Sequence, residues 1–374
     1  MAESMLKVTM EELMRLTIER KASDLHLTVG LPPVLRLSGK LVHTEFPRLM
    51  PDDTKRLVYS ILNDKQREKF EKTWELDCSH AVRGFGRFRV NVFRQRGYVG
   101  ATLRSITGSI PSREELRLPE LIEDVVSRPN GLILVTGATG AGKSTTIACM
   151  LDIINSTRSV HIITIEDPIE YVHPHKKAMI NQREIGHDTQ SWTNALRGTL
   201  REDPDIILIG EMRDFETVAG ALTAAETGHL VFGTLHTSDA SQTIDRIIDI
   251  FPPHQQQQTR VQLAGVLEAV FCQQLVPHSS GIGRVPAMEI LLATPALKSL
   301  IREGKSHQIY NTIQTGSKYG MKTMEQSLLD LCLSNQITED EALARTTHQD
   351  ELKRMIESAR ASGGMRGSAT MKKR

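Results

Sequence analysis

The pattern of hydrophobic and polar residues changes about a third of the way along the chain. Before that point, short stretches alternate between apolar and polar residues, as in DLHLTVGLPPVLRLSGKLVHT and GRFRVNVFRQRGYVGATLRSI. In the second stretch, Phe88 and Val92 fall on one side of the strand and Arg89 on the other. Strict alternation is typical of half-buried β-strands, whereas apolar spacing of three or four residues is typical of helices. The first part of the chain therefore predicts a small α+β unit with helices over 5–20 and 52–72.

After the polar, turn-rich segment TGSIPSREELRLP, the strands become apolar on both faces. GLILVTG, VHIITIED, DIILIGE and LVFGTLH alternate with stretches of helical spacing, and the remainder, from about 254 to 358, reads mostly as helices. Such strands predict an α/β fold whose parallel sheet is covered on both sides. We expect a domain over 1–106, a linker over 107–118, a second domain over 119–360 and a disordered tail over 361–374.

Composition narrows the functional classes. The chain has 46 Lys and Arg against 45 Asp and Glu, and only 4% aromatic residues, so no nucleic-acid partner is expected. No apolar run approaches the roughly 20 residues that span a bilayer, and the N-terminus lacks the apolar core of a signal peptide. The sequence indicates a soluble, cytoplasmic protein with reduced thiols. The cysteines are far apart in sequence and form no C-x-x-C pair, so neither a zinc site nor a disulfide framework is suggested: Cys78, Cys149, Cys272 and Cys332.

The segment GATGAGKS, residues 137–144, fits the phosphate-loop pattern G-x-x-x-x-G-K-[ST] between a predicted strand and a predicted helix. Glycines permit positive φ angles, so backbone N–H groups can surround phosphate oxygens at a helix N-terminus. Lys143 could reach the β- and γ-phosphates, and Ser144 could bind Mg²⁺. We favour a triphosphate with Mg²⁺ over a plain glycine-rich turn, and ATP over GTP because no N-K-x-D segment is present. The expected binding residues are Gly137, Ala138, Thr139, Gly140, Ala141, Gly142, Lys143, Ser144 and Thr145.

Three further strand ends carry groups that could act on a bound triphosphate. Glu211 follows DIILIG and could activate water or hold Mg²⁺ through water, unless it is only a solvated acid. Glu166 and Asp167 follow IITI and could position Mg²⁺ or water, or could simply form a turn before proline. His236 follows VFGTL and could sense the γ-phosphate or could be structural. Arginines that could stabilise the transferred phosphoryl group, or form only surface ion pairs, are Arg197, Arg201, Arg213, Arg89 and Arg104.

The segments GATGAGKSTT, TIEDPIEYVH, LRGTLREDPDIILIGEMRD and GTLHTSDA resemble, in order and spacing, the Walker A, Asp box, Walker B and His box of the type II/IV secretion ATPase superfamily. The similarity runs from ASDLHLTVGLPP to GMKTMEQSL. It implies a RecA-like P-loop NTPase domain and a PAS-like N-terminal domain in a homohexameric ring. It also implies that Lys143 and Ser144 bind ATP–Mg²⁺, that Glu166 assists Glu211, and that His236 couples nucleotide state to domain movement.

Within the superfamily, the chain resembles the retraction ATPases of type IV pili, which power twitching motility. It lacks the four-cysteine zinc motif and the extra N-terminal sequence of assembly relatives. The resemblance implies an ATP-hydrolysing motor at the cytoplasmic face of the inner membrane, with Arg89 and Arg104 acting across the cleft between domains. The implied partners are the pilus platform protein and a paralogous pilus ATPase. Residues 296–316 resemble the C-terminal retraction motif but depart from it at Leu297, Lys298 and Ser299.

Other functions remain compatible with the same motifs. An accessory or regulatory pilus ATPase would bind nucleotide with little turnover, and an assembly or secretion ATPase would share the nucleotide motifs. A DNA translocase is suggested only by the RecA-like core, and the balanced charge and scarce aromatic residues argue against it. For residues 296–316, an ordinary amphipathic helix would explain the apolar positions equally well.

Overall fold

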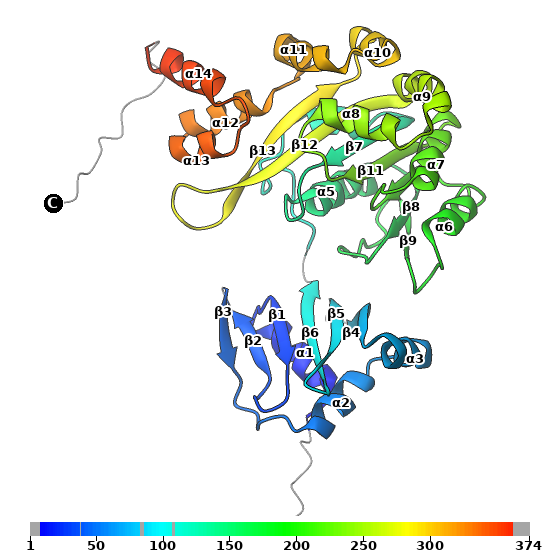
Figure 1. Cartoon of the computed structure of the whole chain (residues 1–374), viewed down its shortest axis with the longest axis vertical. Coiled ribbons are helices and arrows are strands. Elements are labelled where there is room, and N and C mark those ends of the chain that lie inside the picture. Colours follow the sequence, from blue (N-terminus) through cyan, green and yellow to red (C-terminus); the bar gives the residue numbers. More distant parts are fainter. Residues whose placement is uncertain (1–7, 38, 83–85, 107–108, 362–374) are drawn as a thin grey trace, which may run out of the picture. The chain divides into compact units, whose positions relative to one another are not determined.

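The computed structural model describes residues 8–37, 39–82, 86–106 and 109–361. Contacts divide the chain into two compact units, which Figure 1 shows coloured along the sequence. The first unit is Met1–Ser109 with Pro168–Tyr171, and the second is Ile110–Asp167 with Val172–Arg374. Within the described ranges, no helix combines the length and the apolar character needed to cross a membrane. Apart from Ala361, the tail predicted as disordered lies outside the described residues.

The first unit contains a six-stranded antiparallel sheet in the order β3-β2-β1-β6-β5-β4. Side chains from α1, α2 and α3 complete its core. The alternation predicted for β5 is confirmed, since Phe88 and Val92 are fully buried and Arg89 is exposed. The elements of this unit are α1 (Met10–Glu19), β1 (Asp24–Leu27), β2 (Val34–Leu37), β3 (Lys40–His43), α2 (Pro51–Tyr59), α3 (Asp64–Thr73), β4 (Glu75–Val82), β5 (Gly86–Gln95) and β6 (Tyr98–Ile106).

The segment 52–72, predicted as helical, forms two helices, α2 and α3, with a break between Tyr59 and Asp64. Asn63 starts the second one: its side chain accepts a hydrogen bond from the backbone N–H of Gln66, whose own side chain accepts from the N–H of Asn63. This reciprocal capping satisfies backbone donors that a continuous helix would have bonded internally. The following strand, β4, had no counterpart among the predicted elements.

The second unit contains a seven-stranded sheet in the order β13-β12-β7-β11-β10-β8-β9. All its neighbouring strands are parallel except β12 and β13. Helices α4 and α5 cover one face, while α6 to α9 pack on the other. The sheet and its helices include α4 (Leu121–Val126), β7 (Gly131–Thr136), α5 (Lys143–Thr157), β8 (His161–Glu166), β9 (Met179–Glu184), α6 (Trp192–Thr199), β10 (Ile206–Ile209), α7 (Phe215–Glu226), β11 (Leu230–Leu235), α8 (Ala240–Asp249) and α9 (Pro253–Val266).

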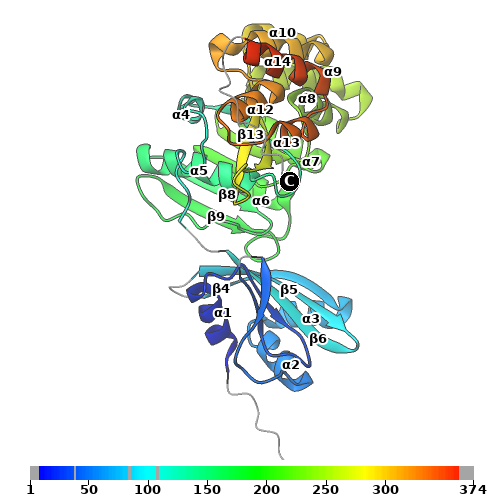
Figure 2. The same ribbon diagram turned by 90° about the vertical axis from the view of Figure 1, so that its left-hand side faces the viewer.

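The prediction of mostly helices from about 254 to 358 is confirmed for α9 but is wrong for residues 267–292. LEAVFCQQLVP and RVPAMEILL form a long hairpin of two strands, β12 and β13, which Figure 1 shows in yellow. A run of buried apolar residues does not distinguish a strand from a helix by periodicity, which explains the error. Figure 2 shows helices α10, α12 and α14 gathered at one end of this unit. These later elements are β12 (Leu267–Pro277), β13 (Arg284–Leu292), α10 (Pro295–Arg302), α11 (Ile309–Thr315), α12 (Met324–Leu333), α13 (Glu339–Ala344) and α14 (Gln349–Ala361).

Two leucines of the first sheet provide a matched test of this core. Leu103 on β6 is fully buried, whereas Leu41 on the edge strand β3 is 56% exposed. We expect Leu103→Ala to lower the free energy of unfolding by about 2–5 kcal/mol, and Leu41→Ala to change it by less than about 0.5 kcal/mol. The chain has two tryptophans, so a Trp192→Phe background leaves Trp74 as the reporter of urea unfolding in the first unit. Equal losses for both leucines would contradict the burial of Leu103 and the exposure of Leu41 in this sheet.

Candidate active site

The predicted phosphate loop lies between the buried strand β7 and helix α5. Three of its residues take positive φ angles, with Gly137 at 139°, Gly140 at 81° and Gly142 at 90°. Residues with side chains rarely adopt these angles, so the glycines permit the turn. Lys143 Nζ donates to the carbonyl oxygens of Gly137 at 2.7 Å and Ala138 at 3.1 Å. The amino group is therefore folded back over the loop that precedes it.

The strand order brings Glu211 and His236 together. Glu211 follows β10 and His236 follows β11, and these parallel neighbours place their carboxyl ends at one edge of the sheet. The two segments stay joined beyond the strands, because the N–H of Met212 donates to the carbonyl oxygen of Thr234 at 3.0 Å. His236 Nε2 lies 2.7 Å from Glu211 Oε1. The structure thus pairs two residues that the sequence suggested separately.

Glycine at position 233 permits this arrangement. A Cβ atom there would lie 2.3 Å from the sulfur of Met212, which is buried in the core. Only a residue without a side chain allows Met212 to pack against β11 at this point. The chain on either side of Met212 carries Glu211 and Arg213, so this packing helps to orient both side chains.

Two opposing effects determine the pKa of Glu211. Burial acts to raise the pKa of this carboxyl group, but hydrogen bonds from Arg213 and His236 outweigh it and hold the pKa below its usual range. Arg213 Nε contacts the same oxygen, Oε1, as His236 does. The Glu211 side chain is 21% exposed, whereas that of Arg213 is 75% exposed. Glu211 is therefore a carboxylate at neutral pH, with one oxygen held by two donors.

The structure places the remaining candidates in different settings. Glu166 ends β8, and its Oε1 accepts hydrogen bonds from Thr164 Oγ1 at 2.6 Å and from Gln182 Nε2 at 3.2 Å. Asp167 follows it and is exposed. Arg201 is exposed in the turn after α6, and Arg197 is exposed on that helix. Asp167 also acts electrostatically on Arg213, the partner of Glu211.

Arg89 and Arg104 belong to the first unit. They face each other as partners on β5 and β6, and Arg104 Nε donates to Asp24 Oδ1 at 3.0 Å. Two neighbouring arginines on one sheet form a local concentration of positive charge that Asp24 offsets in part. Their role toward a nucleotide stays a prediction.

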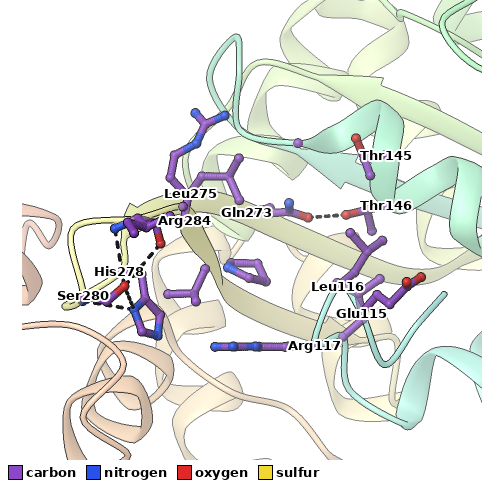
Figure 3. A pocket seen from close by; sticks show the side chains of 16 residues that line it. Glu115, Leu116, Arg117, Thr145, Thr146, Gln273, Leu275, His278, Ser280 and Arg284 are labelled. Carbon is purple, nitrogen blue, oxygen red and sulfur yellow. Dashed lines mark hydrogen bonds between the residues drawn. The ribbon is translucent and has the colours of Figure 1, made fainter. Parts of the chain in front are cut away.

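A cavity of about 620 Å³ lies beside the phosphate loop, within the size range of small-molecule sites. Figure 3 shows its lining: Thr145 and Thr146 from α5, Leu116 and Arg117 from the segment before α4, and His278 from the β12–β13 turn. Three segments far apart in sequence meet here, so no local motif could have indicated the cavity. The other lining residues are Glu115, Leu118, Gly142, Gln273, Leu275, Ser280, Ile282, Gly283, Arg284, Val285 and Pro286.

The available donors fit Mg²⁺ rather than a protein-caged metal. Ser144 offers a hydroxyl oxygen in the first turn of α5, and Glu211 offers carboxylate oxygens at a strand end of the same sheet. Among the residues the structure describes, no three His, Cys, Asp or Glu side chains are grouped to hold a metal ion. Magnesium commonly has one or two protein ligands and takes the others from phosphates and water. Such a site would form with the nucleotide.

Known proteins resemble this chain over nearly its whole length. Residues 114–362 match the family described as type II/IV secretion system protein. The type IV pilus retraction ATPase PilT of Pseudomonas aeruginosa is 50% identical, covering 88% of this chain and 96% of its own. The type IV pilus ATPase PilU of the same organism is 42% identical, covering 92% and 91%. A crystal structure of the pilus retraction motor PilT with bound ADP has a TM-score of 0.87 at 51% identity, covering 93% of this chain and 100% of that one. The chain therefore belongs to the type II/IV secretion system protein family, in the group that contains the pilus retraction ATPases.

Proposed function

We propose that this chain is a Mg²⁺-dependent ATPase whose hydrolysis of ATP drives the retraction of a type IV pilus. The observation that carries the proposal is that the phosphate loop with Lys143 and the Glu211–His236 pair follow the carboxyl ends of neighbouring parallel strands, β7, β11 and β10. Ligands of parallel α/β sheets bind beyond the carboxyl ends of the strands. The similarity to PilT, including a structure with ADP, supports the choice of nucleotide and of pilus retraction.

The phosphates of the nucleotide would bind at the loop, and its base would lie in the neighbouring cavity. Backbone N–H groups of residues 137–145 and the dipole of α5 would hold the phosphates, with Lys143 moving from the loop carbonyls to the β- and γ-phosphates. Ser144 would hold Mg²⁺, which would supply charge neutralisation for the phosphate oxygens. The cavity bounded by Thr145 and Leu116 is large enough for a nucleoside, and its apolar wall suits a base.

Glu211 would act on the attacking water. Its Oε1 is held by His236 and Arg213, so we assign Oε2 to the proton of the water molecule. Glu166, fixed by Thr164 and Gln182, would assist at the next strand end. His236 would report the state of the γ-phosphate because it bonds to the same carboxylate that faces the water.

The proposed function also includes an oligomeric assembly of this chain. As the family resemblance implies, we propose a homohexameric ring in which Arg89 and Arg104 of the first unit, together with Arg201 and Arg213, are the candidates to stabilise phosphoryl charge at the cleft. Hydrolysis would change the angle between the two units of each subunit. The ring would work in the cytoplasm at the inner-membrane face of the pilus machine, on its platform protein and with a paralogous pilus ATPase.

Removing the proposed base tests the hydrolysis. We expect Glu211→Gln to lower kcat for ATP by about a hundredfold or more, because the amide cannot accept the water proton. Lys143→Ala should abolish turnover through loss of phosphate binding. Glu216→Gln is the matched control, since Glu216 is an exposed carboxylate in the first turn of α7, and it should keep full activity. Phosphate release measured at saturating ATP distinguishes these outcomes, and full activity of Glu211→Gln would remove Glu211 from the mechanism.

The pH dependence tests the charge of Glu211. The base works only when deprotonated, so activity falls on the acid side as Glu211 takes up a proton. Arg213 lowers the pKa of Glu211, and its removal must therefore raise that pKa. We expect the acid limb of kcat/KM against pH to move to higher pH in Arg213→Leu and in His236→Leu. Arg246→Leu, an exposed arginine of α8, should leave the limb in place. The nucleotide titrates alike in all variants, so an unmoved limb in Arg213→Leu would exclude Glu211 as its source.

The similarity to PilU, which is 42% identical over 92% of this chain, supports a second candidate function. As an accessory ATPase, the chain would assist another motor and would not be sufficient for retraction. Deleting its gene and restoring either the unaltered or the Glu211→Gln chain separates the two functions. A retraction motor predicts loss of twitching on deletion and rescue only by the unaltered chain. Rescue by both chains would favour the accessory function.

A further inference from the structure

Gln273 is a buried polar residue in an otherwise largely apolar strand. It lies on β12, which runs parallel to β7 beside the phosphate loop, and only 4% of its surface is exposed. A buried amide needs hydrogen-bond partners to offset the loss of water. Figure 3 shows its side chain pointing toward the start of α5. Its partners therefore identify what the residue holds in place.

Both ends of the Gln273 amide bind the phosphate loop or the helix that follows it. Nε2 donates to the carbonyl oxygen of Ala141 at 2.7 Å, and Oε1 accepts from Thr146 Oγ1 at 2.7 Å. A trans peptide places its carbonyl and its N–H on opposite sides. Because the carbonyl of Ala141 points at Gln273, the N–H of Gly142 points away from Gln273, toward the other side of the loop.

Two glycines of the motif allow this close approach. A Cβ atom on Gly137 would lie 2.2 Å from the backbone oxygen of Gln273, and one on Gly142 would lie 2.8 Å from its Nε2 atom. Both distances are shorter than real side chains tolerate. The loop and β12 are thus fitted to each other at both ends of the glycine-rich turn.

We propose that Gln273 is a positioning residue of the nucleotide site, which fixes the phosphate loop in its binding shape through Ala141 and Thr146. The proposal rests on the proposed function, since it assumes that the loop binds nucleotide. Gln273 acts through the loop, whereas Glu211 and His236 lie at the ends of β10 and β11, on other strands of the sheet. Losing the Gln273 amide should therefore weaken nucleotide binding more than it slows the chemical step.

The test compares two adjacent glutamines of the same strand. Gln273→Met keeps the side-chain length and removes both hydrogen bonds. Gln274→Met is the matched control, because Gln274 Nε2 donates to the carbonyl of Arg345 at 3.1 Å and, as the next residue of the strand, faces the opposite side of the sheet. We expect Gln273→Met to raise the Kd for ADP and the KM for ATP by at least about tenfold, with kcat changed less than threefold. Gln274→Met should bind ADP within about twofold of the unaltered chain.

Substitutions of Thr146 test the same hydrogen bond and should disturb the fold less than substitution of Gln273. Thr146→Val removes only the hydroxyl that donates to Gln273, while Thr146→Ser retains it. Thr146→Val should bind ADP several-fold more weakly than Thr146→Ser. Combining Thr146→Val with Gln273→Met should cost less than the product of the two single effects, because both remove the same hydrogen bond.

The outcomes separate this inference from the function on which it rests. If the unaltered chain binds no ADP by calorimetry, the proposed function fails and the inference fails with it. If the unaltered chain binds ADP and Gln273→Met binds it equally well, only the inference is overturned. Should Gln273→Met not fold, equal ADP affinity of Thr146→Val and Thr146→Ser overturns it instead. A loss of kcat with unchanged KM and Kd in Gln273→Met also contradicts a role in holding the loop.

Discussion

Parallel strands bring their carboxyl ends to a single edge of a sheet, and the candidate active site depends on this constraint. The phosphate loop, His236 and Glu211 follow β7, β11 and β10, which are consecutive neighbours in the sheet although they are far apart in sequence. Their strands are buried on both faces by helices, so the backbone that carries these groups is held firmly. Glu166 extends the same row at the end of β8. The residues of such a site can be distant in sequence, because the strand order brings them together.

Those strand-end residues are also the ones that the sequence could indicate. A polar group that follows an apolar strand is visible in the sequence pattern, so the pattern predicts Glu211, His236 and the phosphate loop together with their strands. Gln273 could not be found, because it lies inside the apolar run LEAVFCQQLVP and its partners are distant in sequence. The pattern of this run also predicts a helix wrongly, since a strand buried on both faces shows no alternation of apolar and polar residues. The cavity beside the loop was hidden because its walls come from three separate segments.

Lys143 contributes to the shape of the phosphate loop through its contacts with the loop backbone. The amino group of this half-buried residue donates to the carbonyl oxygens of Gly137 and Ala138. Binding a phosphate would exchange carbonyl oxygens for phosphate oxygens that carry net negative charge, so Coulomb attraction would add to the hydrogen bonds of the ammonium group. The exchange favours binding, while β12 holds the other side of the loop through Gln273.

The lowered pKa of Glu211 bears on how the proposed hydrolysis would proceed. A carboxylate stabilised by Arg213 and His236 is a weaker base than a free one, and a strong general base has a pKa near the working pH. The transition state of phosphoryl transfer, however, is loose. The bond to the leaving group is therefore largely broken before the water must lose its proton, and the reaction does not require a strong base. Positioning of water then matters more than basicity. The two donors that weaken Glu211 as a base also fix one of its oxygens, and that fixation is the property the reaction requires.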